Sequence, residues 1–406
     1  MNVFSKMWCR TFQSVFRMVI PFMPWRKPEV LKLEDGVLGL PKYIKDMGIE
    51  SVLLITDGGI SSLGLCNPLI EALDAEGIIC GVYDRTVPNP TINNVEDACD
   101  MFAACNARAI IAFGGGSPMD CAKAVGARLA RPNKPVHKMK GILKVRRKLP
   151  PLFAIPTTAG TGSETTLAAV ISNPETHEKY PINDFVLIPR YAVLDPKLTV
   201  GLPKKVTSTT GMDALCHAVE AYIGNSNTKE TKAKAINATA LIFKYLKRAY
   251  DDGSDMEARS NMQIAAFDAG VAFTRAYVGN VHAMAHTLGG QYGVPHGLAN
   301  AVLLPYLLEF YGGKVYAKLA RLADAAGIEG ADNKEKALAF IQAIKDMNAY
   351  MNIPDNFGGI IKEEDLPIMC KHAYDEANPL YPVPVLMGKD DFAAMYRKVN
   401  GVKTEA

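Results

Sequence analysis

The sequence lacks an apolar run of the roughly 18 residues that a membrane-spanning helix needs, so its 406 residues predict no transmembrane segment. Its eight cysteines form no C-x-x-C pair and follow no regular spacing, which excludes a disulfide framework and favours reduced thiols. A formal net charge of only +3 gives no reason to expect nucleic acid as a partner. These absences favour a cytoplasmic enzyme that acts on a small molecule.

The first 28 residues lack any acidic side chain and carry basic residues among large apolar ones. Their spacing predicts a basic amphipathic helix that ends near Pro21 and Pro24. Such a segment is typical of a targeting signal, of a helix on a membrane surface, or of a helix that packs on the protein itself or on a second subunit. We expect packing, because Arg17 interrupts the apolar positions and no small-residue cleavage site follows.

A chain of 406 residues predicts two domains, because a single core rarely grows beyond about 250 to 300 residues. From residue 50 to about residue 195, short apolar runs alternate with helical patterns, which is typical of a parallel sheet covered on both faces. The expected strands are Ser51–Thr56, Ile79–Tyr83, Ala109–Phe113, Leu152–Ile155 and Tyr191–Leu194. We therefore predict an α/β, doubly wound parallel-sheet domain that binds a dinucleotide over residues 29–202, with residues 1–28 as an extension.

Beyond Asp195 and Pro196 the strand pattern stops and long helical periodicities take over. The expected helices are Thr210–Gly224, Thr231–Tyr250, Met256–Phe273, Tyr316–Ala326 and Lys334–Met351. Residues 203–406 are therefore predicted to form an all-α second domain.

Five residues of this second domain have the types and the spacing of a metal site. The chain has only seven histidines, and four of them lie in Asp213-x3-His217, His282-x3-His286 and the later His296. Residues four apart share one face of a helix, and the turn around His296 can aim its imidazole at the same point. A carboxylate with several imidazoles is how proteins hold a divalent transition metal.

A glycine-rich turn joins an apolar strand to a helical pattern at residues 113–120. Its three glycines let the backbone approach a pyrophosphate, and the free N–H groups of the helix start would bind the negative charge. Ser117 at the N-cap, Pro118 at the first helical position and Asp120 at the third are typical of a helix start.

A second loop, Pro156–Glu164, also follows an apolar strand and offers hydroxyl and backbone N–H groups. Two such loops at the ends of parallel strands would face one ligand, which favours a dinucleotide. Asp57 ends the first strand, where its carboxylate can accept hydrogen bonds from ribose hydroxyls and would repel a 2′-phosphate. These features predict NAD rather than NADP.

Several motifs, taken in order, resemble the iron-dependent, or group III, alcohol dehydrogenases, which include lactaldehyde reductases and bacterial butanol and propanediol dehydrogenases. The resemblance runs from about residue 28 to the end of the chain. Its motifs are Pro88–Thr91, Gly114–Asp120, Pro156–Glu164, Gly211–His217, His282–His286 and Pro295–Gly297. It implies the architecture of dehydroquinate synthase-like proteins, with metal and substrate in the helical domain.

The resemblance implies that Asp213, His217, His282 and His296 bind the metal, with Fe(II) expected and zinc as the alternative. Spacing alone would also count His286 as a ligand. The resemblance places this histidine beside the nicotinamide and the substrate instead, where it would carry a proton.

The resemblance also implies which residues surround the cofactor and the substrate. The implied NAD(H) contacts are Asp57, Asn89, Gly115, Gly116, Ser117, Pro118, Asp120, Thr157, Thr158, Thr161, Thr166 and Lys179. The implied substrate pocket is lined by Ala168, Val170, Phe273 and Tyr374. Tyr374 stands where relatives often carry a cysteine, so the resemblance does not specify the substrate.

The function predicted is reversible hydride transfer between NAD(H) and a small primary alcohol or aldehyde. The metal would lower the pKa of the bound alcohol, and His286 would take the released proton. The alternatives are a lyase of the dehydroquinate synthase type, a metallohydrolase that uses no nucleotide, and a structural protein. The resemblance further implies a homodimer or a larger homo-oligomer.

Overall fold

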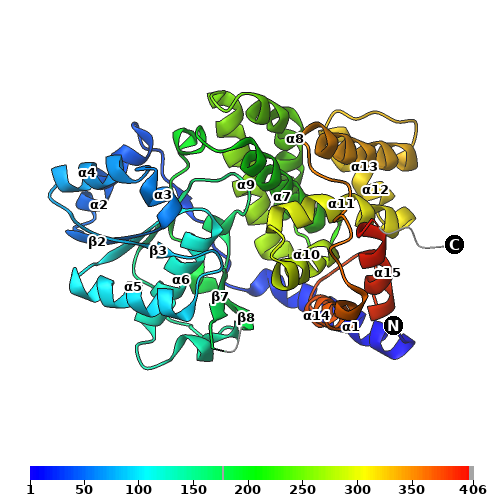
Figure 1. Cartoon of the computed structure of the whole chain (residues 1–406), viewed down its shortest axis with the longest axis horizontal. Coiled ribbons are helices and arrows are strands. Elements are labelled where there is room, and N and C mark those ends of the chain that lie inside the picture. Colours follow the sequence, from blue (N-terminus) through cyan, green and yellow to red (C-terminus); the bar gives the residue numbers. More distant parts are fainter. Residues whose placement is uncertain (176–177, 402–406) are drawn as a thin grey trace. The chain divides into compact units, whose positions relative to one another are not determined.

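The computed structural model describes residues 1–175 and 178–401. The chain forms two compact units, one of residues 24–201 and the other of residues 1–23 with residues 202–406 (Figure 1). The first unit is an α/β structure and the second is helical. This architecture confirms the predicted fold class.

A six-stranded sheet, parallel throughout, forms the centre of the α/β unit. In spatial order its strands are β1 (Glu29–Val30), β9 (Tyr191–Ala192), β6 (Leu152–Pro156), β4 (Ala109–Gly114), β2 (Ser51–Asp57) and β3 (Ile79–Thr86). The chain runs from β2 outward to β3 and then crosses to β4 on the other side of β2. The strand order therefore reverses between β2 and β4, which is where open parallel sheets bind their ligands.

Both faces of this sheet are covered, as the apolar strand sequences require. Leu53 and Ile55 pack on one face with side chains of α5 (Ile92–Ala104) and α6 (Gly116–Ala130). Val52 and Leu54 pack on the other face with side chains of α2 (Leu40–Asp46) and α4 (Asn67–Ala75). The short helix α3 (Gly58–Ser62) directly follows β2.

A second, three-stranded sheet was not predicted. It consists of β5 (Gly141–Ile142), β8 (Glu178–Asn183) and β7 (Ala168–Asn173), with β7 and β8 antiparallel. In β7 and β8, buried side chains stand between partly or fully exposed ones, and β8 contains Pro181, so these strands lack the continuous apolar runs of the main sheet. The predicted strand Tyr191–Leu194 was too long, since β9 ends at Ala192.

The helical unit contains all five predicted helical stretches. They are α7 (Lys204–Ile223), α8 (Lys229–Asp251), α9 (Met256–Ala276), α12 (Tyr316–Ala325) and α13 (Asn333–Tyr350). The same unit also contains α10 (Asn280–Tyr292), α11 (His296–Tyr311), α14 (Leu366–Ala377) and α15 (Lys389–Val399). From Gly211 to Ile223 every residue of α7 is buried, so the polar groups on this stretch lie in the interior.

The N-terminal residues form α1 (Val3–Val19), which packs on the helical unit's own surface. The Arg10 guanidinium donates to the carbonyl oxygens of Val383 and Pro384 at 2.7 and 2.9 Å. The Gln13 amide donates to the carbonyl of Tyr381 at 2.6 Å. Among the described residues no helix, α1 included, combines the length and the apolar character needed to cross a bilayer.

Candidate metal centre and nucleotide loops

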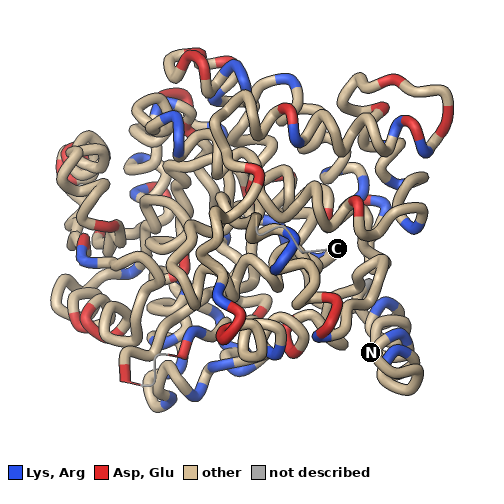
Figure 2. The backbone as a smooth tube through the Cα atoms, turned by 45° about the vertical axis from the view of Figure 1, so that its right-hand side comes forward, with Lys and Arg blue, Asp and Glu red and all other residues tan. Residues whose placement is uncertain are grey.

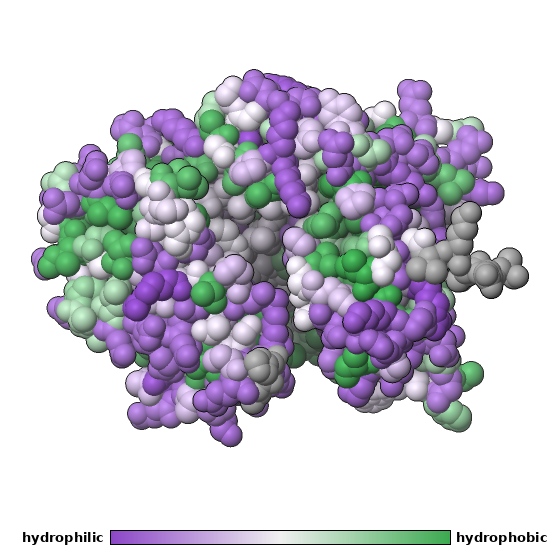
Figure 3. Space-filling model, in the orientation of Figure 1, coloured by the Kyte–Doolittle hydropathy of each residue, from purple (hydrophilic) through white to green (hydrophobic). Residues whose placement is uncertain are grey.

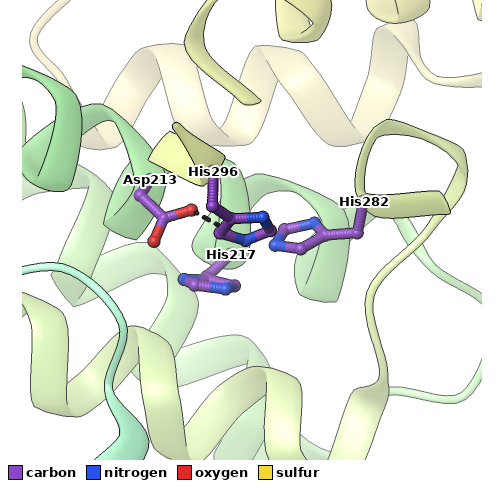
Figure 4. A group of neighbouring side chains, drawn as sticks. All are labelled: Asp213, His217, His282 and His296. Carbon is purple, nitrogen blue, oxygen red and sulfur yellow. Dashed lines mark ion pairs between the residues drawn. The ribbon is translucent and has the colours of Figure 1, made fainter. Parts of the chain in front are cut away.

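Four predicted metal ligands meet inside the helical unit (Figure 4). Asp213 and His217 come from successive turns of α7, His282 from α10 and His296 from the first residue of α11. One ligand atom from each lies within 4.8 Å of one from every other, and the Asp213 carboxylate is 3.5 Å from Nε2 of His296. His286 does not belong to this group.

Close packing of two helices brings His296 to the ligands of α7. A methyl group on Gly297 would lie 2.4 Å from the carbonyl oxygen of Thr209, so only glycine allows α11 to begin this near α7. Within α7, the four-residue spacing places Asp213 and His217 on one face, as the sequence predicted.

Aromatic rings hold two of the imidazoles in place. The ring of Phe273 stacks on His217 with centroids 4.1 Å apart, and His217 stacks on His282 at 4.6 Å. Asp213, His217 and His282 are buried, whereas the His296 side chain is 38% exposed. A ligand would therefore reach the group on the side of His296.

The sequence analysis missed Glu220, which orients His282 from α7. A Glu220 carboxylate oxygen lies 2.6 Å from Nδ1 of His282, and the carboxylate also accepts the backbone N–H groups of Gly279 and Val281 at 2.9 Å each. Burial raises the pKa of Glu220 to about 7, against the lowering effect of these backbone hydrogen bonds. A second acid in the apolar sequence of α7, three residues after His217, was the available signal.

His282 is held in the form that a metal requires. Burial, and then the nearby imidazoles, lower its pKa well below the ordinary value, which keeps the ring neutral. When Nδ1 donates to Glu220, the lone pair of Nε2 is left to face the ligand group.

The amide of Asn300 shows that the ligand atoms converge. Its nitrogen lies 2.7 Å from Oδ1 of Asp213 and 3.1 Å from Nε2 of both His282 and His296. Two amide hydrogens cannot serve three acceptors, whereas a cation at this place could bind all of them. The donor set of one carboxylate and three imidazoles therefore fits a divalent transition metal.

His286 lies beside the ligand group and is held by a carboxylate of its own. Its ring stacks on His296 with centroids 5.1 Å apart, and its side chain is 41% exposed. Its Nδ1 lies 2.6 Å from Glu376 on α14, and the same carboxylate oxygen accepts the Tyr381 hydroxyl at 2.7 Å. Glu376 and Tyr381 were not predicted.

In the α/β unit, the two predicted nucleotide loops lie side by side, because β4 and β6 are neighbours. The N–H of Thr157 donates to the carbonyl of Gly114 at 3.1 Å. Methyl groups built on Gly115 and Gly116 would meet Thr158 and Thr161 at 3.6 and 3.3 Å. The predicted N-cap was wrong: Gly115 caps α6, and Ser117 lies inside the first turn together with Pro118.

Asp57 ends β2, as predicted, and caps α3 by accepting the N–H of Ile60 at 3.0 Å. Two other predicted cofactor residues, far apart in the sequence, contact each other: the Lys179 amine donates to the Asn89 side chain at 2.6 Å. Asn89 has a positive φ of 57°.

Two predicted cofactor residues make internal hydrogen bonds. The Asp120 carboxylate accepts from the Ser163 hydroxyl at 3.0 Å and from the N–H of Val170 at 3.1 Å. Thr166 is buried and accepts from the Lys123 amine at 2.6 Å.

Lys123, which the sequence analysis missed, joins α6 to the second loop. Its amine also donates to the Ser163 hydroxyl and to the carbonyl of Ala168, both at 2.9 Å. The side chain is fully buried, and burial lowers its pKa to about 8.

The four predicted pocket residues are divided between the units. Ala168 and Val170 lie on β7 of the α/β unit and are partly exposed. In the helical unit, Phe273 stacks on the ligand His217, and Tyr374 lies on α14, two residues before Glu376.

Comparison with known families gives matches along nearly the whole chain. Residues 28–196 match the iron-containing alcohol dehydrogenase model, and residues 207–400 match the C-terminal model of the Fe-containing alcohol dehydrogenase family. Alcohol dehydrogenase 4 of Schizosaccharomyces pombe is 40% identical over 376 residues, which cover 91% of this chain and 88% of the relative.

Solved structures show the same fold. The crystal structure of a 1,3-propanediol oxidoreductase matches with a TM-score of 0.88 and 35% identity, over 92% of this chain and 99% of the other. The sulfoacetaldehyde reductase of Bifidobacterium kashiwanohense, in complex with NAD+, matches with a TM-score of 0.83 and 27% identity, over 94% and 100% of the two chains.

Proposed function

The chain belongs to the iron-containing alcohol dehydrogenase family and is a metal-dependent, NAD-linked alcohol dehydrogenase or aldehyde reductase, and we propose that its substrates are small primary alcohols and their aldehydes. The α/β unit would bind the dinucleotide, and the helical unit would bind the metal and the substrate. The convergence of Asp213, His217, His282 and His296 carries this proposal.

Asp213, His217, His282 and His296 would hold the ion, with Fe(II) as the expected metal and zinc as the alternative. When bound, such an ion polarises an alcohol or carbonyl oxygen and eases loss of the hydroxyl proton. Glu220 keeps His282 in the neutral, Nε2-facing form, while Phe273 fixes the ring of His217. Because His296 is the exposed member of the group, the substrate oxygen would approach on its side.

His286 would carry the proton between the substrate and solvent. Its Nδ1 faces the Glu376 carboxylate at 2.6 Å, so Nε2 is the atom that would accept the proton. The Glu376 carboxylate then stabilises the imidazolium that forms. When bound, NAD would supply the hydride acceptor for alcohol oxidation, and His286 would take the hydroxyl proton; aldehyde reduction would be the reverse.

The glycine loop and the second loop would bind the pyrophosphate of NAD through the N-terminus of α6. Asp57 ends β2 at the reversal of strand order, where a carboxylate suits the ribose hydroxyls of NAD and disfavours the phosphate of NADP. Lys123 would stabilise the shape of the second loop through the hydrogen bonds of its amine to Ser163 and Thr166.

The test is NADH oxidation by anaerobically purified protein with a panel of short aldehydes, with the metal content measured on the same sample. We expect turnover that depends on a near-stoichiometric transition metal and is lost on chelation. If the protein instead hydrolyses its substrate, or eliminates a group from it, without net consumption of NADH, the protein is a hydrolase or a lyase. Tight binding of NADH, seen as energy transfer from tryptophan to the nicotinamide, would by itself exclude a metallohydrolase that uses no nucleotide.

We propose a cytoplasmic location, which the eight free cysteines of the described residues support. The homodimer or larger homo-oligomer expected from the resemblance stays a prediction, and sedimentation velocity of the full chain tests it.

A further inference from the structure

Helix α1 packs on the helical unit with one side and exposes an apolar stripe on the other. Toward the protein it presents Cys9 and Gln13, which are buried, and Arg10, which bonds to residues 383 and 384. Toward solvent it presents an apolar stripe, and Phe4, Trp8 and Met18 of this stripe are 79, 62 and 65% exposed. The apolar stripe consists of Val3, Phe4, Met7, Trp8, Val15, Met18 and Val19.

An ordinary surface helix turns its apolar side to the core, whereas α1 leaves a large part of its apolar surface exposed. Single exposed apolar residues are normal on proteins, but a contiguous stripe marks a surface that meets another apolar phase. In Figure 3, hydrophobic side chains lie at the lower right, where Figure 1 places the N-terminal end of α1.

The hydrogen bonds of the opposite face show that this is a stable orientation. Gln13 donates to the carbonyl groups of Tyr381 and Pro379 at 2.6 and 3.2 Å, and the ring of Phe16 packs against Tyr277 with centroids 5.5 Å apart. Turning the apolar stripe inward would break the hydrogen bonds of Arg10 and Gln13.

The charged residues of α1 itself are all positive. Lys6 and Arg17 are exposed along one edge, and residues 1–28 contain no acid. Figure 2 shows basic and no acidic segments along the helix that carries the N-terminus. The pKa of Lys318 is lowered to about 8 by its burial and then by the positive charges of Lys232 and Arg17, so further cations lie near this edge.

We propose that α1 docks the protein on the surface of an anionic lipid bilayer, with the apolar stripe in the headgroup region and Lys6 and Arg17 against lipid phosphates. A large apolar face with a basic edge is the pattern of a helix that lies in the plane of a membrane surface. Trp8 suits this boundary, because its ring is apolar and its N–H needs a polar partner.

A second copy of this chain is the less suitable occupant. If two α1 helices packed stripe to stripe, no acid in residues 1–28 would pair with the basic edges, and in the antiparallel direction these edges would meet each other. An anionic bilayer supplies both the apolar phase and the opposite charge.

The experiment is co-sedimentation of the full chain with vesicles of phosphatidylcholine, with or without phosphatidylglycerol. We expect binding to the anionic vesicles that weakens as salt is added and is much lower on the neutral vesicles. In a Trp25→Phe protein, Trp8 is the remaining tryptophan, and its emission should shift to shorter wavelength when anionic vesicles are added. Absence of binding to phosphatidylglycerol vesicles overturns the proposal.

Two sets of variants locate the surface. Replacing Phe4 and Met18 together with Ser should weaken vesicle binding at least tenfold, and Lys6→Gln or Arg17→Gln should weaken it about fivefold each. The matched control replaces Leu338 and Ile368, which are 45 and 43% exposed on α13 and α14, with Ser and should change nothing. NADH-linked activity in solution should be retained in every variant.

Two results contradict a lipid surface as the occupant. One is vesicle binding that survives the Phe4→Ser and Met18→Ser changes undiminished. The other is a wild-type protein that does not bind vesicles, together with a variant whose mass in sedimentation velocity is half that of the wild-type protein. That second result would assign the apolar stripe to a second copy of the chain.

Discussion

The carboxylate of Glu220 lies 2.6 Å from Nδ1 of His282 and also accepts the N–H groups of Gly279 and Val281 at the start of α10. One buried side chain therefore fixes both the position of the helix that carries His282 and the tautomer of its imidazole. A ligand histidine needs such support, because the wrong tautomer would present a proton in place of a lone pair.

Replacing Glu220 with Gln should weaken metal binding about 10- to 100-fold. The neutral amide stabilises the His282 tautomer with its proton on Nδ1 less strongly, and the amide N–H can instead donate to Nδ1 and favour the other tautomer. The measurement is competitive titration of Zn²⁺ against a chromophoric chelator. Glu309→Gln, at a half-exposed carboxylate on α11 that pairs with Lys345, is the matched control. Equal metal affinities for the Glu220→Gln and wild-type proteins would show that Glu220 only supports the fold.

Replacing His282 or His286 with Ala should separate ligand from proton carrier. The His282→Ala protein should lose metal, because three ligands remain and Glu220 loses its partner. The His286→Ala protein should keep its metal and lose about 100-fold or more in kcat. Metal analysis after gel filtration, beside steady-state rates, gives both values. A His286→Ala protein purified without metal would make His286 a ligand.

Replacing Glu376 with Gln should lower kcat about tenfold with little change in KM, because the carboxylate that stabilises the His286 imidazolium is lost. A double-mutant cycle gives the decisive measurement: in a His286→Ala background, Glu376→Gln should have no further effect on kcat. Additive losses would mean that Glu376 acts independently of His286. Tyr381→Phe, which removes the second hydrogen bond to the same carboxylate oxygen, serves as a milder comparison.

The residues that the sequence revealed were those whose pattern is local. Asp213 and His217 lie four apart on one helix, and the glycine turn directly follows an apolar strand, so chain spacing alone places these groups. The main strands were visible because burial on both faces makes them continuously apolar, as in the fully buried Val52, Leu53 and Leu54 of β2.

The supporting residues were hidden because they act across long distances in the chain. Glu376 is 90 residues from His286, and Glu220 is 62 residues from His282, so no spacing rule connects them. The N-cap of α6 was misjudged because Ser117 is the usual residue type, whereas the observed cap is Gly115, which has an extended backbone and no side chain. The exposed apolar stripe of α1 could be seen only in the structure, because an amphipathic sequence pattern ordinarily means that the apolar side chains face the core.

Replacing Gly116 with Ala should weaken NADH binding about tenfold and leave the metal content unchanged. The new methyl group would lie 3.3 Å from Thr161 between the two loops, where the pyrophosphate needs close contact with the backbone. Alanine fits the helical backbone of Gly116, so the fold should survive. Fluorescence titration with NADH measures the affinity, and Gly290→Ala, where a methyl meets nothing, is the control. An unaltered affinity for NADH would show that the pyrophosphate does not bind at this loop.

Replacing Asp57 with Ser should relax the choice between the two nicotinamide cofactors. Serine can still cap α3 through the N–H of Ile60, so the loop should keep its shape. The negative charge that would repel a 2′-phosphate is removed, and the preference for NADH over NADPH, taken as the ratio of kcat/KM values with one aldehyde, should fall at least tenfold. Asp84→Ser tests whether the loss of any acid at this edge of the sheet changes the preference for NADH. Asp84 lies on the neighbouring β3 and accepts a hydrogen bond from the Ser61 hydroxyl at 2.8 Å. If Asp57→Ser and the wild-type protein discriminate equally, Asp57 has only a capping role and another residue reads the ribose.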